Sequence, residues 1–109
     1  MADVLQGTLD LLVLKTLSLE PLHGWGIGNR IQELSSDVFQ VGQGSLYPSL
    51  HRLERNGLIE AEWGVSENNR RAKYYSLTAR GRAELRTAVD AWTRHAAALQ
   101  HALSFRASA

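Results

Sequence analysis

The stretch that decides the fold is GQGSLYPSLHRLERNGLIEAEW, which runs from Gly42 to Trp63. Its leucines recur at helical spacing and predict a helix with one apolar face: Leu46, Leu50 and Leu53. Pro48 lies inside this stripe, although proline normally breaks a helix interior. If the helix begins near Gly44, Pro48 falls among the first helical N–H groups, which have no internal partner. Pro48 would then fix the start of the helix.

The side chains between the leucines are polar, with few acids among them: Ser45, Tyr47, Ser49, His51 and Arg52. On a helix they are expected on the face opposite the leucines. Serine hydroxyls and arginine suit base edges and phosphates of DNA, and a tyrosine hydroxyl can contact phosphate. This outer face therefore predicts a helix that reads DNA. Gly57, after Asn56, predicts its C-cap.

The flanking segments predict one domain that is mainly α, of the α+β class. Helical spacing predicts a first helix over 5–19, and a second helix carries the stripe Ile27, Ile31 and Leu34. Residues 38–41 suggest a brief strand. Alternation predicts strands at 58–63 and 71–77, joined by a polar turn as a β-hairpin. Thr78 suits the N-cap of a last helix. A helix-turn-helix followed by a hairpin predicts a winged helix, whose third helix enters the DNA major groove.

The predicted hairpin lies in a basic part of a chain whose net charge is only +1. Between positions 70 and 86 one acid, Glu84, accompanies six basic residues: Arg70, Arg71, Lys73, Arg80, Arg82 and Arg86. The hairpin cations Arg70, Arg71 and Lys73 are candidates for contacts with phosphates or a minor groove. A solvated basic surface without a partner is the alternative, and the position on a wing favours nucleic acid.

The last helix carries a heptad seam with spacings of 4 and 3, made by Leu85, Val89, Trp92, Ala96, Leu99 and Leu103. Such a seam is typical of a helix packed lengthwise on another helix. A second copy of the chain would cover it, so we expect a homodimer. Leu5 and Leu9 are expected at the same interface, because the first helix is apolar on more than one face. The alternative is a seam that folds back on its own domain. Residues 1–77 would form the winged helix and residues 78–109 the dimerisation helix.

The composition argues against catalysis and metal binding. The chain contains no cysteine, which excludes disulfides and thiolate sites and suits a cytoplasmic protein. The histidines are scattered and form no HExxH motif: His23, His51, His95 and His101. No signal-peptide pattern is present, and the longest apolar run is too short for a membrane span. We therefore expect no catalytic residue, metal, cofactor or membrane partner.

The segments GSLYPSLHRLERNGLIEAEW and RRAKYYSLTARGRAEL closely resemble the PadR family of bacterial transcriptional regulators. The segment GTLDLLVLKTLSLEPLHGWGI is similar to that family's first two helices, so the resemblance covers nearly the whole chain. It implies a dimeric winged-helix repressor of the short subfamily with a single C-terminal helix. Carried over, the reading helix holds Ser45, Tyr47, Pro48, Ser49 and His51 or Arg52, and the wing holds Arg70, Arg71 and Lys73. Asn68 and Asn69 replace a glycine that many members have at the wing tip. Asparagine tolerates left-handed geometry, so the turn should be retained.

Trp92 has two interpretations. Some members of the family bind flat aromatic drugs between paired tryptophans at the dimer centre, and VDAWTRH places Trp92 at what looks like the matching position. A planar cationic ligand would suit two such indoles. Packing in the dimer seam alone also explains the residue. The sequence and the resemblance together predict a homodimeric repressor that binds double-stranded DNA at an inverted-repeat operator. They also suggest a small aromatic effector. The rival interpretation is a winged helix that binds proteins and not DNA.

Overall fold

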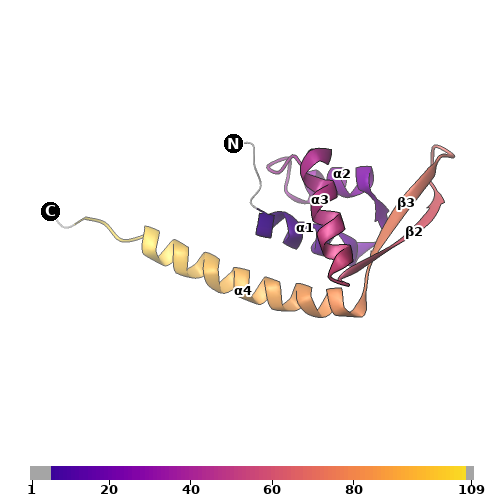
Figure 1. Ribbon diagram of the computed structural model, residues 1–109. Coiled ribbons are helices and arrows are strands. Elements are labelled where there is room, and N and C mark those ends of the chain that lie inside the picture. Colours follow the sequence, from indigo (N-terminus) through magenta and orange to yellow (C-terminus); the bar gives the residue numbers. More distant parts are fainter. Residues whose placement is uncertain (1–5, 108–109) are drawn as a thin grey trace.

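The computed structural model describes residues 6–107, which form four helices and a small antiparallel sheet (Figure 1). The elements in chain order are α1 (Gln6–Leu19), β1 (Leu22–His23), α2 (Gly24–Leu34), α3 (Gln43–Arg55), β2 (Ile59–Val65), β3 (Arg71–Leu77) and α4 (Ala79–Leu103). The strand order in the sheet is β1-β3-β2. The predicted winged helix-turn-helix is therefore confirmed, with α2 and α3 as the helix-turn-helix and β2–β3 as the wing.

Helix α3 begins at Gln43, next to the predicted start near Gly44. Gly42 is its N-cap, and the Gly42 carbonyl accepts the N–H groups of Ser45 and Leu46. Pro48 consequently lies in the second turn, and the idea that it marks the helix start is wrong. A proline there cannot donate to the Gly44 carbonyl, but both residues are exposed, so water can reach that oxygen.

The end of α3 matches the prediction. Gly57 has a φ of +76°, its N–H donates to the Glu54 carbonyl, and the N–H of Leu58 donates to the Leu53 carbonyl. These two bonds form a Schellman motif, in which glycine adopts the left-handed conformation without steric cost. The motif turns the chain directly into β2, and it thereby fixes where the wing leaves α3.

The brief strand expected at residues 38–41 is absent, and that segment is a loop. Ser36 and Asp37 both have positive φ values and close α2, which turns the chain out of an extended path. The short strand is instead β1, where Leu22 pairs with Tyr75 and His23 pairs with Tyr74. Two residues show no alternation, so the sequence pattern could not reveal this strand.

The core lies where α1 packs against the other three helices and against β3. Its buried apolar residues come from α1, α2, α3 and the sheet: Leu9, Val13, Leu14, Leu17, Ile27, Ile31, Leu46, Leu50, Leu53, Ile59 and Tyr75. Leu9 is 4% exposed within its own protomer, so its expected place on the dimer interface is wrong. Leu34, the last residue of the predicted α2 stripe, is exposed. Leu5 lies outside the described residues.

Helix α4 starts against the wing and then leaves the rest of the molecule (Figure 1). The Thr78 hydroxyl accepts the N–H of Gly81 at 3.0 Å, which confirms the predicted N-cap. Leu85 packs against the core, so this seam residue is already used inside the protomer. Beyond it the helix exposes Val89, Trp92, Leu99 and Leu103. None of the described helices is long and apolar enough to cross a membrane.

Candidate nucleic-acid interface

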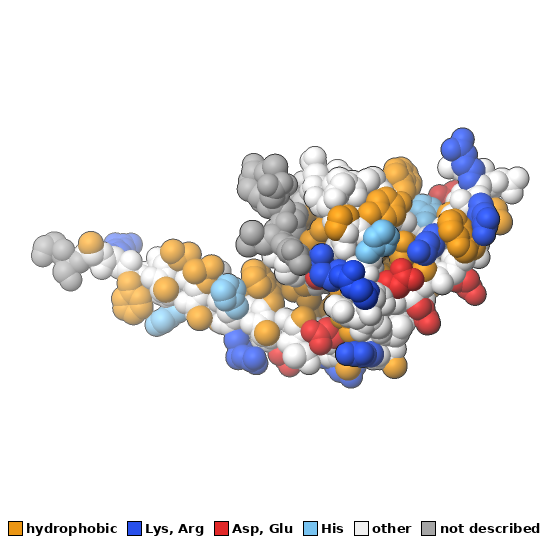
Figure 2. Space-filling view, viewed as in Figure 1, with side chains coloured by type: hydrophobic (Ala, Val, Ile, Leu, Met, Phe, Trp, Pro, Cys, Tyr) orange, Lys and Arg blue, Asp and Glu red, His pale blue; other side chains and the backbone are white. Residues whose placement is uncertain are grey.

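A groove of about 640 Å³ lies between the start of α2, the outer face of α3 and the wing. It brings together five of the residues expected to bind DNA, which are Tyr47, His51, Arg70, Arg71 and Lys73. They come from two segments that lie far apart in the sequence, and the β2–β3 hairpin places them side by side. Figure 2 shows basic and hydrophobic side chains together at the wing end of this face.

The wing cations differ in their surroundings. The Arg71 guanidinium lies 4.4 Å from the centre of the Trp63 ring, a cation–π contact that leaves its N–H groups available. Lys73 Nζ lies 3.7 Å from Glu54 Oε1 on α3. Within residues 6–107, Arg70 and Arg71 form no ion pair, so neither guanidinium is already bound to a carboxylate.

Tyrosines from α3 and β3 also line the groove. Tyr47 reaches across to α2, where a Cβ added to Gly24 would lie 2.9 Å from the Tyr47 hydroxyl oxygen. Gly24 thus leaves room for this ring, which is partly exposed. Tyr75 is buried, and burial raises the pKa of its phenol above the ordinary value of 10.0. Its hydroxyl therefore stays neutral at physiological pH and adds no charge to the groove.

Two residues of the predicted reading face point inward instead. Ser49 is 1% exposed, and its hydroxyl donates to Asp10 Oδ1 on α1 at 2.6 Å. Arg52 donates to the same carboxylate from Nη2 at 2.6 Å and from Nε at 3.2 Å. The expectation that Ser49 lies on the outer face is wrong, because it sits on the edge that meets α1. Arg52 is held in a bidentate ion pair, so its first role is to fasten α3 to α1.

The remaining predicted residues of α3, Ser45 and Pro48, are exposed but do not line the groove. The basic residues Arg80, Arg82 and Arg86 belong to α4 and also lie outside it. The groove contains aromatic residues that the sequence pattern did not single out, Trp25 and Trp63, both exposed. Trp25 lies on α2 and Trp63 on β2 of the wing, so two exposed aromatic rings adjoin the basic side chains of the groove.

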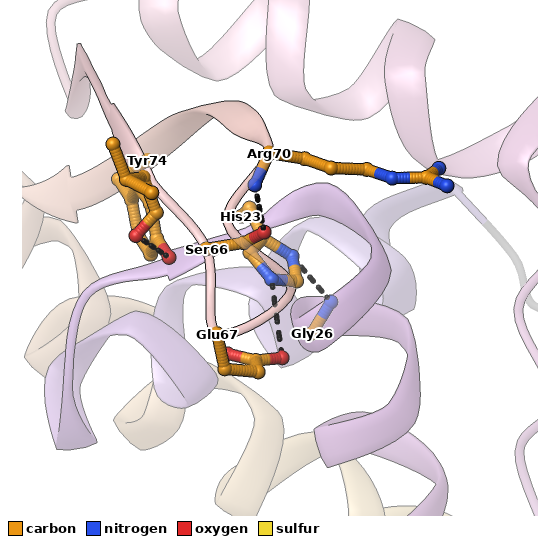
Figure 3. A network of polar contacts seen from close by, with 7 residues as sticks. His23, Gly26, Ser66, Glu67, Arg70 and Tyr74 are labelled. Carbon is orange, nitrogen blue, oxygen red and sulfur yellow. Dashed lines mark hydrogen bonds and ion pairs between the residues drawn. The ribbon is translucent and has the colours of Figure 1, made fainter.

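His23 contacts both strand β3 and the tip loop of the wing (Figure 3). Its Nδ1 accepts the N–H of Gly26 at 3.1 Å and caps α2. Its ring packs edge-on against Tyr74, with the ring centroids 5.3 Å apart. Its Nε2 faces Glu67 Oε1 of the wing loop at 4.0 Å. Among the described residues no group of three His, Cys, Asp or Glu side chains could hold a metal ion.

Comparisons with known proteins find similarity to transcriptional regulators. Residues 13–87 match the model of the Transcriptional regulator PadR-like family. Transcriptional regulator Rv3488 of Mycobacterium tuberculosis is 46% identical over 54 residues, which is 50% of each chain. A second relative, an uncharacterized protein of Lysinibacillus sphaericus, is 31% identical over 91 residues, or 84% of each chain.

Solved structures share the whole fold. A PadR family transcriptional regulator from Eggerthella lenta is 30% identical, with a TM-score of 0.77, over 93% of this chain and 86% of its own. A transcriptional regulator from Clostridium thermocellum is 25% identical, with a TM-score of 0.81, over 92% and 97% of the two chains. The similarity thus includes α4 as well as the winged helix.

Proposed function

Because this chain belongs to the PadR-like family of transcriptional regulators, we propose that it is a homodimeric repressor that binds double-stranded DNA at an inverted repeat. The observation that carries the proposal is the meeting of Tyr47 and His51 with Arg70 and Arg71 in one groove. In this arrangement α3 enters a major groove while the wing follows the adjacent backbone. A two-fold dimer would place two copies of α3 on two half-sites. Such a protein is expected in the cytoplasm.

The first test is a gel-shift titration of purified protein with DNA from upstream of its own gene. A shuffled duplex of equal length serves as the control, at low and moderate salt. Sequence-specific binding predicts a shift that prefers the native probe and survives moderate salt, whereas the phosphate contribution alone is lost as salt rises. Absence of a shift on both probes would favour the rival function, a winged helix that binds protein partners.

Two substitutions should separate base reading from phosphate contact. We expect Arg71→Ala to weaken binding to native and shuffled probes alike, by about tenfold, and to reduce the salt slope by about one. Tyr47→Ala should weaken mainly the native probe, because a side chain of the reading helix contributes to discrimination. Fluorescence anisotropy with the native and the shuffled probe measures, for each variant, the loss of affinity relative to the wild type. A selective loss for Arg71→Ala, or an unchanged Tyr47→Ala, would reverse these assignments.

The exposed stripe on α4 supports the dimer. Leu99 is 50% exposed in the protomer although it occupies a heptad position. We expect Leu99→Glu to weaken the dimer about a hundredfold, because it brings two like charges together in the seam and such contacts cost several kcal/mol. Gln100→Glu places the same charge at the neighbouring exposed position and should leave the dimer intact. Sedimentation velocity over a range of concentrations distinguishes them, and a dimeric Leu99→Glu variant would refute this seam.

A planar cationic effector at Trp92 is a second candidate feature. The indole is half-exposed on the same stripe and lies at a tilt to His95, with the ring centroids 5.6 Å apart. Packing of Trp92 in the seam explains the residue without a ligand, and we retain that as the main interpretation. Ethidium is a suitable probe with the variant W25F/W63F, which keeps Trp92 as its one tryptophan. Saturable quenching of Trp92 fluorescence by ethidium would support an effector site. Quenching that rises linearly with ethidium concentration would support seam packing alone.

A further inference from the structure

One acid, Glu67, lies among the cations that line the groove. An acid on a surface that approaches DNA repels phosphates, and its removal alone should tighten binding to any sequence. Glu67 belongs to the loop 66–70, which joins β2 to β3 at the tip of the wing (Figure 1). Within residues 6–107, its approach to His23 is the one ion pair or hydrogen bond between that loop and the rest of the molecule.

His23 is a fixed point for this contact. Its side chain is 16% exposed, and its position is set by the pairing with Tyr74, by the edge-on ring contact and by the cap of α2. Because Nδ1 accepts the Gly26 N–H, the neutral ring carries its proton on Nε2. His23 Nε2 lies 4.0 Å from Glu67 Oε1. Figure 3 shows the carboxylate on that side of the ring. The exposed carboxylate is thus attracted to a nearly buried ring at the start of α2.

The loop transmits this contact to the DNA-facing cations because it is closed by its own hydrogen bonds. The N–H of Ser66 donates to the Arg70 carbonyl at 2.8 Å, and the N–H of Asn69 donates to the Ser66 carbonyl at 2.8 Å. Asn69 adopts the left-handed conformation with a φ of 59°, as its residue type allows. A loop bonded in this way moves as a unit, so the position of Glu67 also sets that of Arg70.

We propose that His23 and Glu67 form a positioning contact that holds the wing tip against α2 and thereby sets the distance between Arg70 and the reading helix. The inference rests on the proposed DNA-binding function, in which operator contacts need α3 and the wing in one fixed arrangement. Glu67 is then a positioning residue whose benefit on the operator outweighs its repulsion of phosphate.

Whether Glu67→Ala lowers or raises the affinity for DNA decides between a positioning role and simple repulsion of phosphate. We expect Glu67→Ala to weaken binding of the native probe by about twofold, because a carboxylate that is 73% exposed and faces a neutral imidazole contributes less than an exposed ion pair. Glu62→Ala is the matched control, since it removes the same charge from an exposed position on β2. If Glu67→Ala instead tightens native and shuffled probes alike, as charge removal predicts, the positioning role is overturned.

A double-mutant cycle assigns the effect to His23. In His23→Asn the asparagine still caps α2, because it is among the best N-cap residues, but it cannot reach the wing loop. Adding Glu67→Ala to this variant should cause no further loss on the native probe. An equal loss in both backgrounds would show that Glu67 acts without His23 and would overturn the proposal.

A measurement on the free protein keeps this proposal separate from the proposed function. Backbone ¹⁵N order parameters of residues 66–70 should fall in Glu67→Ala and in His23→Asn and stay unchanged in Glu62→Ala. Unchanged order parameters in the first two variants would overturn the contact even if the protein binds DNA. Lowered order parameters together with no binding of any duplex would retain the contact and refute the DNA-binding function.

Discussion

Gly81→Ala should destabilise the protein by more than about 3 kcal/mol, because the added methyl group meets backbone atoms that cannot move aside. A Cβ on Gly81 would lie 2.0 Å from the Leu58 carbonyl oxygen and 3.0 Å from its carbon. That carbonyl already accepts the N–H of Thr78 at 3.1 Å, and the Thr78 hydroxyl donates to the Gly57 carbonyl at 2.7 Å. Relief of the clash must therefore break the junction that fixes the first turn of α4 on the wing.

The measurement is thermal unfolding at one fixed protomer concentration, because the proposed dimer would make the midpoint concentration-dependent. A loss of this size lowers the midpoint by roughly 12 °C or more in a domain of about 100 residues. Gly7→Ala is the matched control, since a Cβ on this exposed helical glycine meets nothing within 4 Å. It should leave stability equal or raise it by up to about 1 kcal/mol through helix propensity. A midpoint for Gly81→Ala equal to that of the wild type would show that α4 is not anchored there.

The elements whose residues repeat with a clear period were predictable from sequence. The stripe Leu46, Leu50 and Leu53 is buried as expected, and the alternation at residues 71–77 forms β3. The predicted helix caps at Gly57 and Thr78 are also confirmed, because both form through hydrogen bonds to residues nearby in the sequence. These features depend on residues within one turn or one strand, and a single sequence contains that information.

Features that depend on a second segment were not predictable. The pattern placed Ser49 outside because it is polar, but its partner Asp10 lies on α1, far away in the sequence. No sequence pattern marked Gly81 as important, since its need for space arises from the Leu58 carbonyl just before β2. The same holds for the groove, where the hairpin brings Trp25 and Trp63 beside the predicted residues. The residue types predicted the kind of contact that the groove can make, but tertiary packing determines which of these residues line the groove.

Asp10→Asn should weaken both folding and the proposed DNA binding, because one carboxylate accepts hydrogen bonds from two residues of α3. The Asp10 oxygens accept from the buried Ser49 hydroxyl and from two nitrogens of Arg52, whose side chain is 26% exposed. An amide has one oxygen, and its NH₂ group would face the guanidinium donors. Hydrogen bonds to charged groups contribute about 1.5–3 kcal/mol, and this pair lies at the boundary with solvent, so we expect a loss of about 2 kcal/mol.

Denaturant unfolding and binding of the native probe measure the two effects of Asp10→Asn, with Glu20→Gln as the control. Glu20 is an exposed acid just beyond the other end of α1, so its substitution removes the same charge and should change stability by less than about 0.5 kcal/mol. If Arg52 instead serves chiefly to contact DNA, loss of its carboxylate partner frees the guanidinium, and Asp10→Asn should bind the probe more tightly. Weaker binding would support the proposal that α1 holds α3 in place, because the proposed presentation of Tyr47 and His51 to DNA requires the inner edge of α3 to stay fastened.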